Sequence, residues 1–219
     1  MAELIDFAYR HHPKSIFMTS HDGTELSIDD VYKHSMDVAR SLVYLNLKDV
    51  ILFTENSPRQ VVVLLGTMLA GGRVSMVYHS SSSNMCEYVV KQTQSKIIFV
   101  DSLERYEMVR DLVDTVVLMH DKNSWSDFSS FGRCGPYPGF PEPQPNDCCI
   151  IIYTSGTTGN PKGVMLSYDN ILFSANAHIE NNPILLSEPM RVISHLPMSH
   201  IGALMNDVIV PLMCITRGQ

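Results

Sequence analysis

The sequence has 219 residues and a net charge of −7 at neutral pH, with 45% hydrophobic and 18% charged residues. This length allows one large domain, or a domain and a half, with a sizeable core, and the composition excludes collagen, low complexity and global disorder. Because the charge balance is acidic, we expect no nucleic-acid partner.

The cysteines indicate free thiols in a reducing compartment. Their number is odd, no two have the Cys-x-x-Cys spacing, and two are adjacent within an apolar run. The N-terminus lacks the basic and apolar regions of a secretory signal, and every apolar run is shorter than the ~20 residues that span a bilayer. We therefore expect a cytoplasmic protein with no transmembrane segment, while peripheral contact with an internal membrane stays open. The cysteines are Cys86, Cys134, Cys148, Cys149 and Cys214.

The chain opens with a helix, a turn and a second helix. A short helix is expected over the first ten residues, and two extended pieces flank a turn at 21–24. Ser27 and Asp30 form a pattern like a capping box, and apolar residues then recur at helical spacing as far as Leu45. This spacing predicts an amphipathic helix.

A strand followed by a helix then recurs along the first half of the chain. Ser57 and Pro58 supply an N-cap and a proline at the first position of an apolar helix that ends at Gly71 and Gly72. Such alternation predicts an α/β fold with a mostly parallel, helix-covered sheet. The strands are expected over 50–53, 74–78, 97–100 and 115–119, with the later helices over 85–94 and 103–112.

A segment rich in proline and glycine, residues 130–147, divides the chain. Its composition is incompatible with regular structure and predicts a joining loop. We therefore expect an α/β subdomain over 1–129 and the start of a second one over 148–219. The second begins with an apolar strand over 148–153.

The strand is followed by a short strand and a helix. The short strand is expected over 164–166, and Ser167 or Asp169 could cap the helix. Near the end of the sequence, the apolar stretch 208–215 is predicted to be a passage from helix to strand.

Residues 153–164 have the chemistry of a phosphate-binding loop; they read Tyr-Thr-Ser-Gly-Thr-Thr-Gly-Asn-Pro-Lys-Gly-Val. The glycines permit positive φ and close backbone approach, so that N–H groups can converge on an anion. The hydroxyls add donors, and Lys162 adds a cation. Pro161 and the strand after Lys162 distinguish this loop from the Walker P-loop, which opens directly into a helix. The alternative is a surface turn with one exposed lysine, which the length of the run disfavours.

This run resembles the signature loop of adenylate-forming, or AMP-binding, enzymes, and the resemblance extends over nearly the whole chain. It implies the large domain of that fold, in which the loop holds the phosphates of ATP while a carboxylate attacks the α-phosphorus. Coenzyme A then displaces AMP from the acyl-adenylate. The residues to which the resemblance assigns ATP-phosphate binding are Thr154, Ser155, Gly156, Thr157, Thr158, Gly159, Asn160, Pro161 and Lys162.

Residues 196–201, Leu-Pro-Met-Ser-His-Ile, are similar to a segment of long-chain acyl-CoA synthetases, particularly the bubblegum type. That similarity implies that His200 lines the acyl and adenylate pocket. From the residues alone, His200 would be a histidine at a strand-to-helix corner with a locally satisfied ring. His195 and His200 have no cysteine or carboxylate cluster near them in sequence, so no metal ligand is expected. Ser199 is not expected to be a triad nucleophile, because His200 is adjacent in sequence rather than converging from elsewhere, and no catalytic residue is assigned.

The resemblance implies ATP-dependent activation of a long-chain fatty acid to acyl-adenylate and then to acyl-CoA. The implied cofactors and partners are ATP, Mg²⁺, coenzyme A and the fatty acid. Family members are far longer, and their magnesium-holding Glu, ribose-binding Asp, hinge and adenylation Lys do not occur before Gln219. We therefore expect an N-terminal part of the large domain, without the rest of that domain or the small mobile domain. The alternative is a catalytically inactive fragment or isoform that binds only a nucleotide or a partner.

Overall fold

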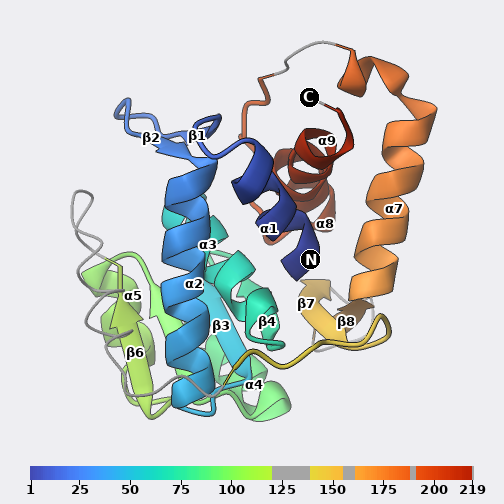
Figure 1. The fold of residues 1–219 in the computed structure, drawn as a ribbon. Coiled ribbons are helices and arrows are strands. Elements are labelled where there is room, and N and C mark those ends of the chain that lie inside the picture. The colour runs from blue at the N-terminus through green and yellow to red at the C-terminus, as the bar shows by residue number, and fades with distance from the viewer. Residues whose placement is uncertain (120–138, 155–160, 188–190, 219) are drawn as a thin grey trace.

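A central β-sheet organises the computed structural model, which describes residues 1–119, 139–154, 161–187 and 191–218. Within these residues its strands run in the order β6-β5-β3-β4-β7-β8, all parallel except β8, which is antiparallel to β7. This arrangement confirms the predicted mostly parallel sheet (Figure 1). The strands are β3 (Asp49–Phe53), β4 (Arg73–Val77), β5 (Ile97–Val100), β6 (Thr115–Leu118), β7 (Cys148–Thr154) and β8 (Lys162–Ser167). A separate antiparallel pair consists of β1 (Ile16–Thr19) and β2 (Glu25–Ser27).

Helices cover both faces of the sheet, and each set has its own apolar core. One face carries α1 (Ala2–His11), α2 (Ile28–Tyr44), α3 (Pro58–Leu69), α7 (Tyr168–Asn181) and α9 (Val210–Gly218). The other face carries α4 (Ser83–Thr93) and α5 (Leu103–Val109). Helices α1 and α9, from opposite ends of the sequence, pack against each other (Figure 1).

The central strands β3, β4, β5 and β7 are mainly apolar because both of their faces are buried. On β3, Val50 and Leu52 belong to the core under α2 and α3, while Ile51 and Phe53 belong to the core under α4 and α5. This alternation follows from the two-residue period of a strand. None of the helices in the described ranges is long and apolar enough to cross a membrane.

The predicted helix starts are confirmed by their capping bonds. Ser27 Oγ accepts from the Asp30 N–H at 3.2 Å, and the Asp30 carboxylate accepts from the Ser27 N–H at 2.9 Å, which makes the capping box complete. Ser57 caps α3 ahead of Pro58, as expected. The N-cap of α7 is Ser167, since its hydroxyl accepts a hydrogen bond from the N–H of Asn170, the third residue of the helix.

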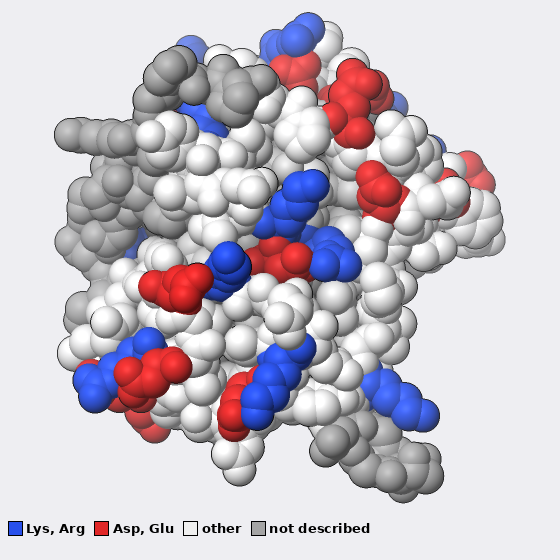
Figure 2. Space-filling view, turned by 90° about the horizontal axis from the view of Figure 1, so that it is seen from below, with Lys and Arg blue, Asp and Glu red and all other residues white. Residues whose placement is uncertain are grey.

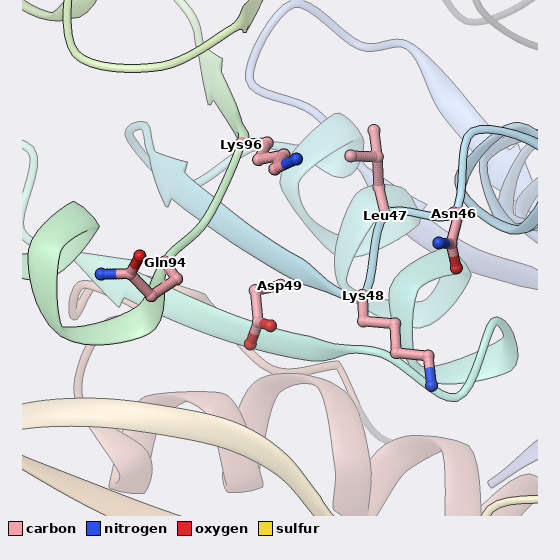
Figure 3. Close-up of a pocket in the computed structure, with 6 residues that line it drawn as sticks. All are labelled: Asn46, Leu47, Lys48, Asp49, Gln94 and Lys96. Atoms are coloured by element: carbon pink, nitrogen blue, oxygen red, sulfur yellow. The ribbon is translucent and has the colours of Figure 1, made fainter.

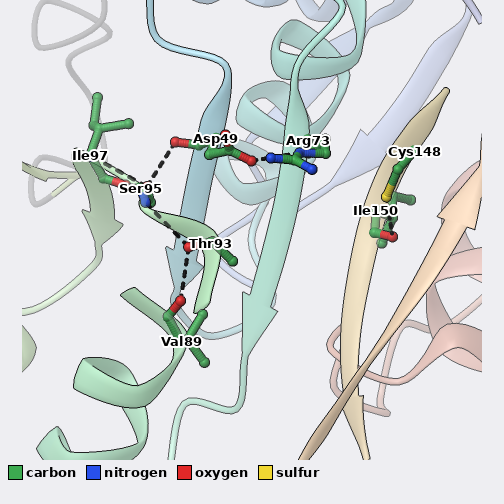
Figure 4. A network of polar contacts seen from close by, with 8 residues as sticks. All are labelled: Asp49, Arg73, Val89, Thr93, Ser95, Ile97, Cys148 and Ile150. Carbon is green, nitrogen blue, oxygen red and sulfur yellow. Dashed lines mark hydrogen bonds and ion pairs between the residues drawn. The ribbon is translucent and has the colours of Figure 1, made fainter. Parts of the chain in front are cut away.

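A polar network joins the amino ends of the central strands (Figure 4). Arg73 Nε on β4 donates to the Asp49 carboxylate on β3 at 2.6 Å. Ser95 Oγ lies 2.7 Å from the Asp49 carbonyl oxygen and 2.9 Å from that of Ile97 on β5. These contacts satisfy polar groups that would otherwise be left unpaired at this edge of the sheet.

The stretch 208–215 is helical, so the predicted passage into a strand is wrong. A π-helix, Met205–Ile209, follows the short helix α8 (Ile201–Leu204) and continues into α9. Val208, Ile209 and Leu212 are buried at helical spacing against the core that α1 and α7 also cover. An apolar run with no polar interruption cannot by itself distinguish a buried helix from a strand.

The predicted joining loop lies partly outside the described residues. Its described part, 139–147, has no helix or strand. The domain boundaries that we placed around it stay a prediction.

Candidate functional site

Thr154, one of the predicted site residues, and Tyr78 lie at the carboxyl ends of two neighbouring parallel strands. Thr154 ends β7, and Tyr78 directly follows β4. In the register of these strands Met76 pairs with Ile152, so two residues further along Tyr78 comes beside Thr154. The next helices leave β3 and β4 toward opposite faces of the sheet. Open α/β sheets bind their ligands at such a divergence of strand ends.

Thr154 and Lys162 mark the two ends of the predicted phosphate-binding loop. They are register partners across β7 and β8, and Thr154 Oγ1 donates to the Lys162 carbonyl oxygen at 3.5 Å. Both side chains are exposed, and Pro161 beside them is half-buried. The hairpin therefore brings both ends of the loop to the carboxyl edge of the sheet. Ser155, Gly156, Thr157, Thr158, Gly159 and Asn160 lie outside the described residues, and their phosphate contacts stay a prediction.

Gly163 is required by a close approach of side chains from β7. A Cβ at this position would lie 3.0 Å from Cγ2 of Ile151 and 3.3 Å from the ring of Tyr153. Its φ is not positive, so of the two roles expected for this glycine only close approach applies. The Tyr153 ring is buried and stands edge-on to Tyr88, with 6.4 Å between the centroids.

His200 is the N-cap residue of α8, and its ring contacts a residue far away in sequence. The Tyr78 hydroxyl lies 2.6 Å from Nδ1 and 2.7 Å from Nε2 of His200, and the two rings are edge-to-face. Burial raises the pKa of Tyr78, so its hydroxyl carries a proton at neutral pH and can donate it to one of the two nitrogens. The ring of His200 is therefore not satisfied locally, because Tyr78 comes from the end of β4.

Asn56, which follows β3, connects the segment 194–198 to the same edge. Its Nδ2 donates to Ser194 Oγ at 3.0 Å and to the Leu196 carbonyl oxygen at 2.7 Å. Its Oδ1 accepts from the Met198 N–H at 2.9 Å. Sequence reasoning assigned no role to Asn56, although a polar residue three positions after a buried strand was a signal.

A charged cluster links the loops after β3, β4 and β5. Arg105 pairs with Asp101, donates from Nη2 to Glu55 Oε1 at 3.1 Å and donates from Nε to the His79 carbonyl oxygen at 3.1 Å. Its guanidinium carbon also lies 5.6 Å from the centre of the Phe53 ring. These contacts engage Arg105 in holding the loops together, and no sequence motif indicated them.

The buried thiols have low reactivity. Burial raises the pKa of Cys86 and Cys149 to about 12, so both are protonated at neutral pH and are poor nucleophiles. Among the residues that the structure describes, no three His, Cys, Asp or Glu side chains come together as a metal site.

A shallow pocket of about 310 Å³ lies at the opposite, amino edge of the sheet (Figure 3). Lys48 and Lys96 extend in different directions there, and Asp49 is already paired with Arg73. Over this side of the molecule, the described basic and acidic side chains are interspersed (Figure 2). The pocket therefore lacks the convergent charge that an anion site needs. Its lining residues are Asn46, Leu47, Lys48, Asp49, Gln94 and Lys96.

Comparisons with known proteins show the family to which the chain belongs. The model of the AMP-binding enzyme family matches residues 5–216. Long-chain-fatty-acid–CoA ligase ACSBG2 of Rattus norvegicus is 33% identical over 211 residues, covering 85% of this chain and 32% of that protein. Long-chain-fatty-acid–CoA ligase ACSBG1 of Homo sapiens is 32% identical over 206 residues, covering 84% of this chain and 28% of that protein. The chain thus spans about a third of the length of the curated relatives that it matches.

Solved structures share the fold. A putative long-chain-fatty-acid CoA ligase from Rhodopseudomonas palustris superimposes with a TM-score of 0.82 at 17% identity, over 96% of this chain and 55% of that one. ATP-bound MatB from the same organism superimposes with a TM-score of 0.80 at 22% identity, over 98% of this chain and 44% of that one. At these identities the likeness shows the fold alone. Because the family match extends over nearly the whole chain, this protein belongs to the AMP-binding enzyme family and is related to the bubblegum-type long-chain fatty acid CoA ligases.

Proposed function

We propose that this chain takes part in the ATP-dependent activation of a long-chain fatty acid to an acyl-adenylate, which coenzyme A then converts to acyl-CoA. The observation that carries the proposal is the meeting of two features at one edge of the sheet. The hairpin of β7 and β8 brings Thr154 and Lys162 to this edge, and His200 lies there because its ring contacts the Tyr78 hydroxyl. The names of the relatives, long-chain-fatty-acid–CoA ligases, supply the substrate class.

The roles follow from the chemistry of the residues. The loop from Thr154 to Lys162 would hold the ATP phosphates through backbone N–H groups and hydroxyls. Lys162 is exposed, so its ammonium group is accessible to the outer phosphates. His200 would line the acyl and adenylate pocket beside the α-phosphorus.

Magnesium would accompany ATP and neutralise part of the phosphate charge. We assign no ligand for it to this chain, because the described residues hold no suitable cluster of His, Cys, Asp or Glu side chains. Coenzyme A is proposed as the thiol co-substrate.

An inactive nucleotide- or partner-binding module is the second candidate. As a nucleotide-binding module, the second candidate would use the same phosphate-binding loop. The two candidates differ in whether the protein that contains this chain releases pyrophosphate when ATP and oleate are added together, which only the first candidate predicts.

Replacing Lys162 with alanine is expected to weaken ATP binding roughly ten-fold to a hundred-fold and AMP binding much less. The reason is that a charge-assisted contact contributes about 1.5–3 kcal/mol and this cation faces the outer phosphates. Isothermal titration calorimetry with each nucleotide measures the difference. The matched control is Lys96→Ala, an exposed lysine at the amino edge of the sheet, which should leave both affinities unchanged. Equal ATP affinities for wild type and Lys162→Ala would contradict the proposal.

A further inference from the structure

We propose that Asn56 is a positioning residue that holds the segment 194–198 on the carboxyl edge of the sheet and thereby fixes His200 against Tyr78. The proposal depends on the proposed function only for what His200 faces, the acyl and adenylate pocket. The hold itself depends on the geometry of the hydrogen bonds.

Both the NH₂ group and the oxygen of the Asn56 side-chain amide form hydrogen bonds with the held segment. Its amide nitrogen donates to Ser194 Oγ and to the Leu196 carbonyl oxygen, and its oxygen accepts from the Met198 N–H. A carboxylate could accept but not donate, and an alkyl side chain could do neither. The three partners lie 138 to 142 residues further along the chain, so these are long-range tertiary hydrogen bonds rather than the bonds of a local turn.

The held segment has little other support. Residues 191–197 form no helix or strand, and every side chain from Arg191 to Leu196 is exposed, with Ile193 at 82%. Within the segment His195 Nδ1 lies 3.1 Å from the nearby Ile193 carbonyl oxygen. A stretch with few buried apolar contacts opens at low free-energy cost, so long-range hydrogen bonds decide where it lies.

Asn56 is itself held on both sides. It follows β3, whose last residues are buried, and it precedes Ser57, the capping residue of α3. A side chain between a buried strand end and a capped helix provides a rigid platform. Two residues beyond Met198 the chain reaches His200, whose N–H donates to the Pro197 carbonyl oxygen at 2.9 Å. Fixing Leu196 and Met198 therefore fixes the start of α8.

The test compares variants of the 219-residue chain by hydrogen exchange and by the NMR signals of the His200 and Tyr78 rings. Asn56→Ala is expected to speed amide exchange in 194–200 about ten-fold, because it removes all three bonds at once. The signals of both rings should shift together, while exchange in β3 stays as in wild type. Asn56→Asp, which retains an acceptor for the Met198 N–H, should give a smaller change.

Two further variants separate a local hold from a general effect on folding. Ser194→Ala, at an exposed site, removes the hydroxyl that accepts one of the Asn56 hydrogen bonds. It should raise amide exchange in 194–200 by a smaller factor than Asn56→Ala does. Asn176→Ala is the matched control, since the Asn176 amide donates to the Glu180 carboxylate within the same helix, α7, and the variant should behave as wild type. Unchanged exchange in 194–200 for both Asn56→Ala and Ser194→Ala, or an equal rise throughout β3, would overturn the proposal.

An oleate titration distinguishes this proposal from the proposed function. If both hold, the His200 signals of the wild type respond to oleate below its micellar concentration, and those of Asn56→Ala respond more weakly. If His200 does not respond in the wild type while the exchange pattern is as expected, the pocket role is overturned and the positioning role is supported. An identical oleate response in wild type and Asn56→Ala counts against Asn56 as a positioning residue.

Discussion

Replacing Phe99 with alanine is expected to lower the free energy of unfolding by about 3–5 kcal/mol. Phe99 lies on β5, between β3 and β6, and its side chain is fully buried in the core that α2 and α3 cover. Its removal loses apolar burial and leaves a cavity that rigid neighbouring strands cannot close. Urea denaturation followed by circular dichroism measures the loss.

The control is Leu103→Ala, at the start of α5, where the side chain is 57% exposed. An exposed substitution of this kind should change stability by no more than about 0.5 kcal/mol. Similar unfolding midpoints for the Phe99 and Leu103 variants would contradict the described core.

Replacing Gly66 with leucine is expected to destabilise the protein by about 3 kcal/mol or more, the upper part of the range for overpacked cores. Gly66 lies where α3 packs against α2, and a single added Cβ would already be 2.7 Å from the Ser35 carbonyl oxygen and from Val38 Cβ. The two helices would have to separate. Gly66→Ala should lose less, because it adds only the Cβ, whereas leucine adds three further carbons to the same contact.

Gly202→Ala provides the control for this pair of variants. Gly202 is also helical, but a Cβ there would meet no atom within 4 Å. Thermal unfolding should therefore place the Gly202 variant near wild type and both Gly66 variants below it. A wild-type melting temperature for Gly66→Leu would mean that α2 and α3 do not approach as described.

Features encoded by neighbouring residues were predictable from the sequence. The capping box at Ser27 and Asp30 and the N-cap at Ser57 depend on a few adjacent residues, and the structure confirms them. The alternation of strands and helices predicted the parallel sheet for the same reason. The choice of Ser167 over Asp169 required the geometry of the helix start, because both residue types are good caps.

Features that depend on distant parts of the chain were not predictable. The bonds from Asn56 to the segment 194–198 and from Arg105 to Glu55 join residues brought together only by the order of the strands. The apolar run 208–215 was misassigned because burial on all sides removes the pattern that separates a helix from a strand. The phosphate-binding role of the loop stays a prediction from its residue types, whereas the position of Thr154 beside Tyr78 depends on the order of the strands.

The central claim is that ATP binds by its phosphates at the carboxyl edge of the sheet, through the loop from Thr154 to Lys162. Hydrogen exchange with and without saturating ATP, using AMP as the comparison, tests it most directly. The account predicts slower exchange in peptides covering 152–166 with ATP, a weaker effect with AMP, and no change around Lys48 and Lys96 at the amino edge. Protection confined to the amino edge, or equal protection of 152–166 by AMP and ATP, would contradict it.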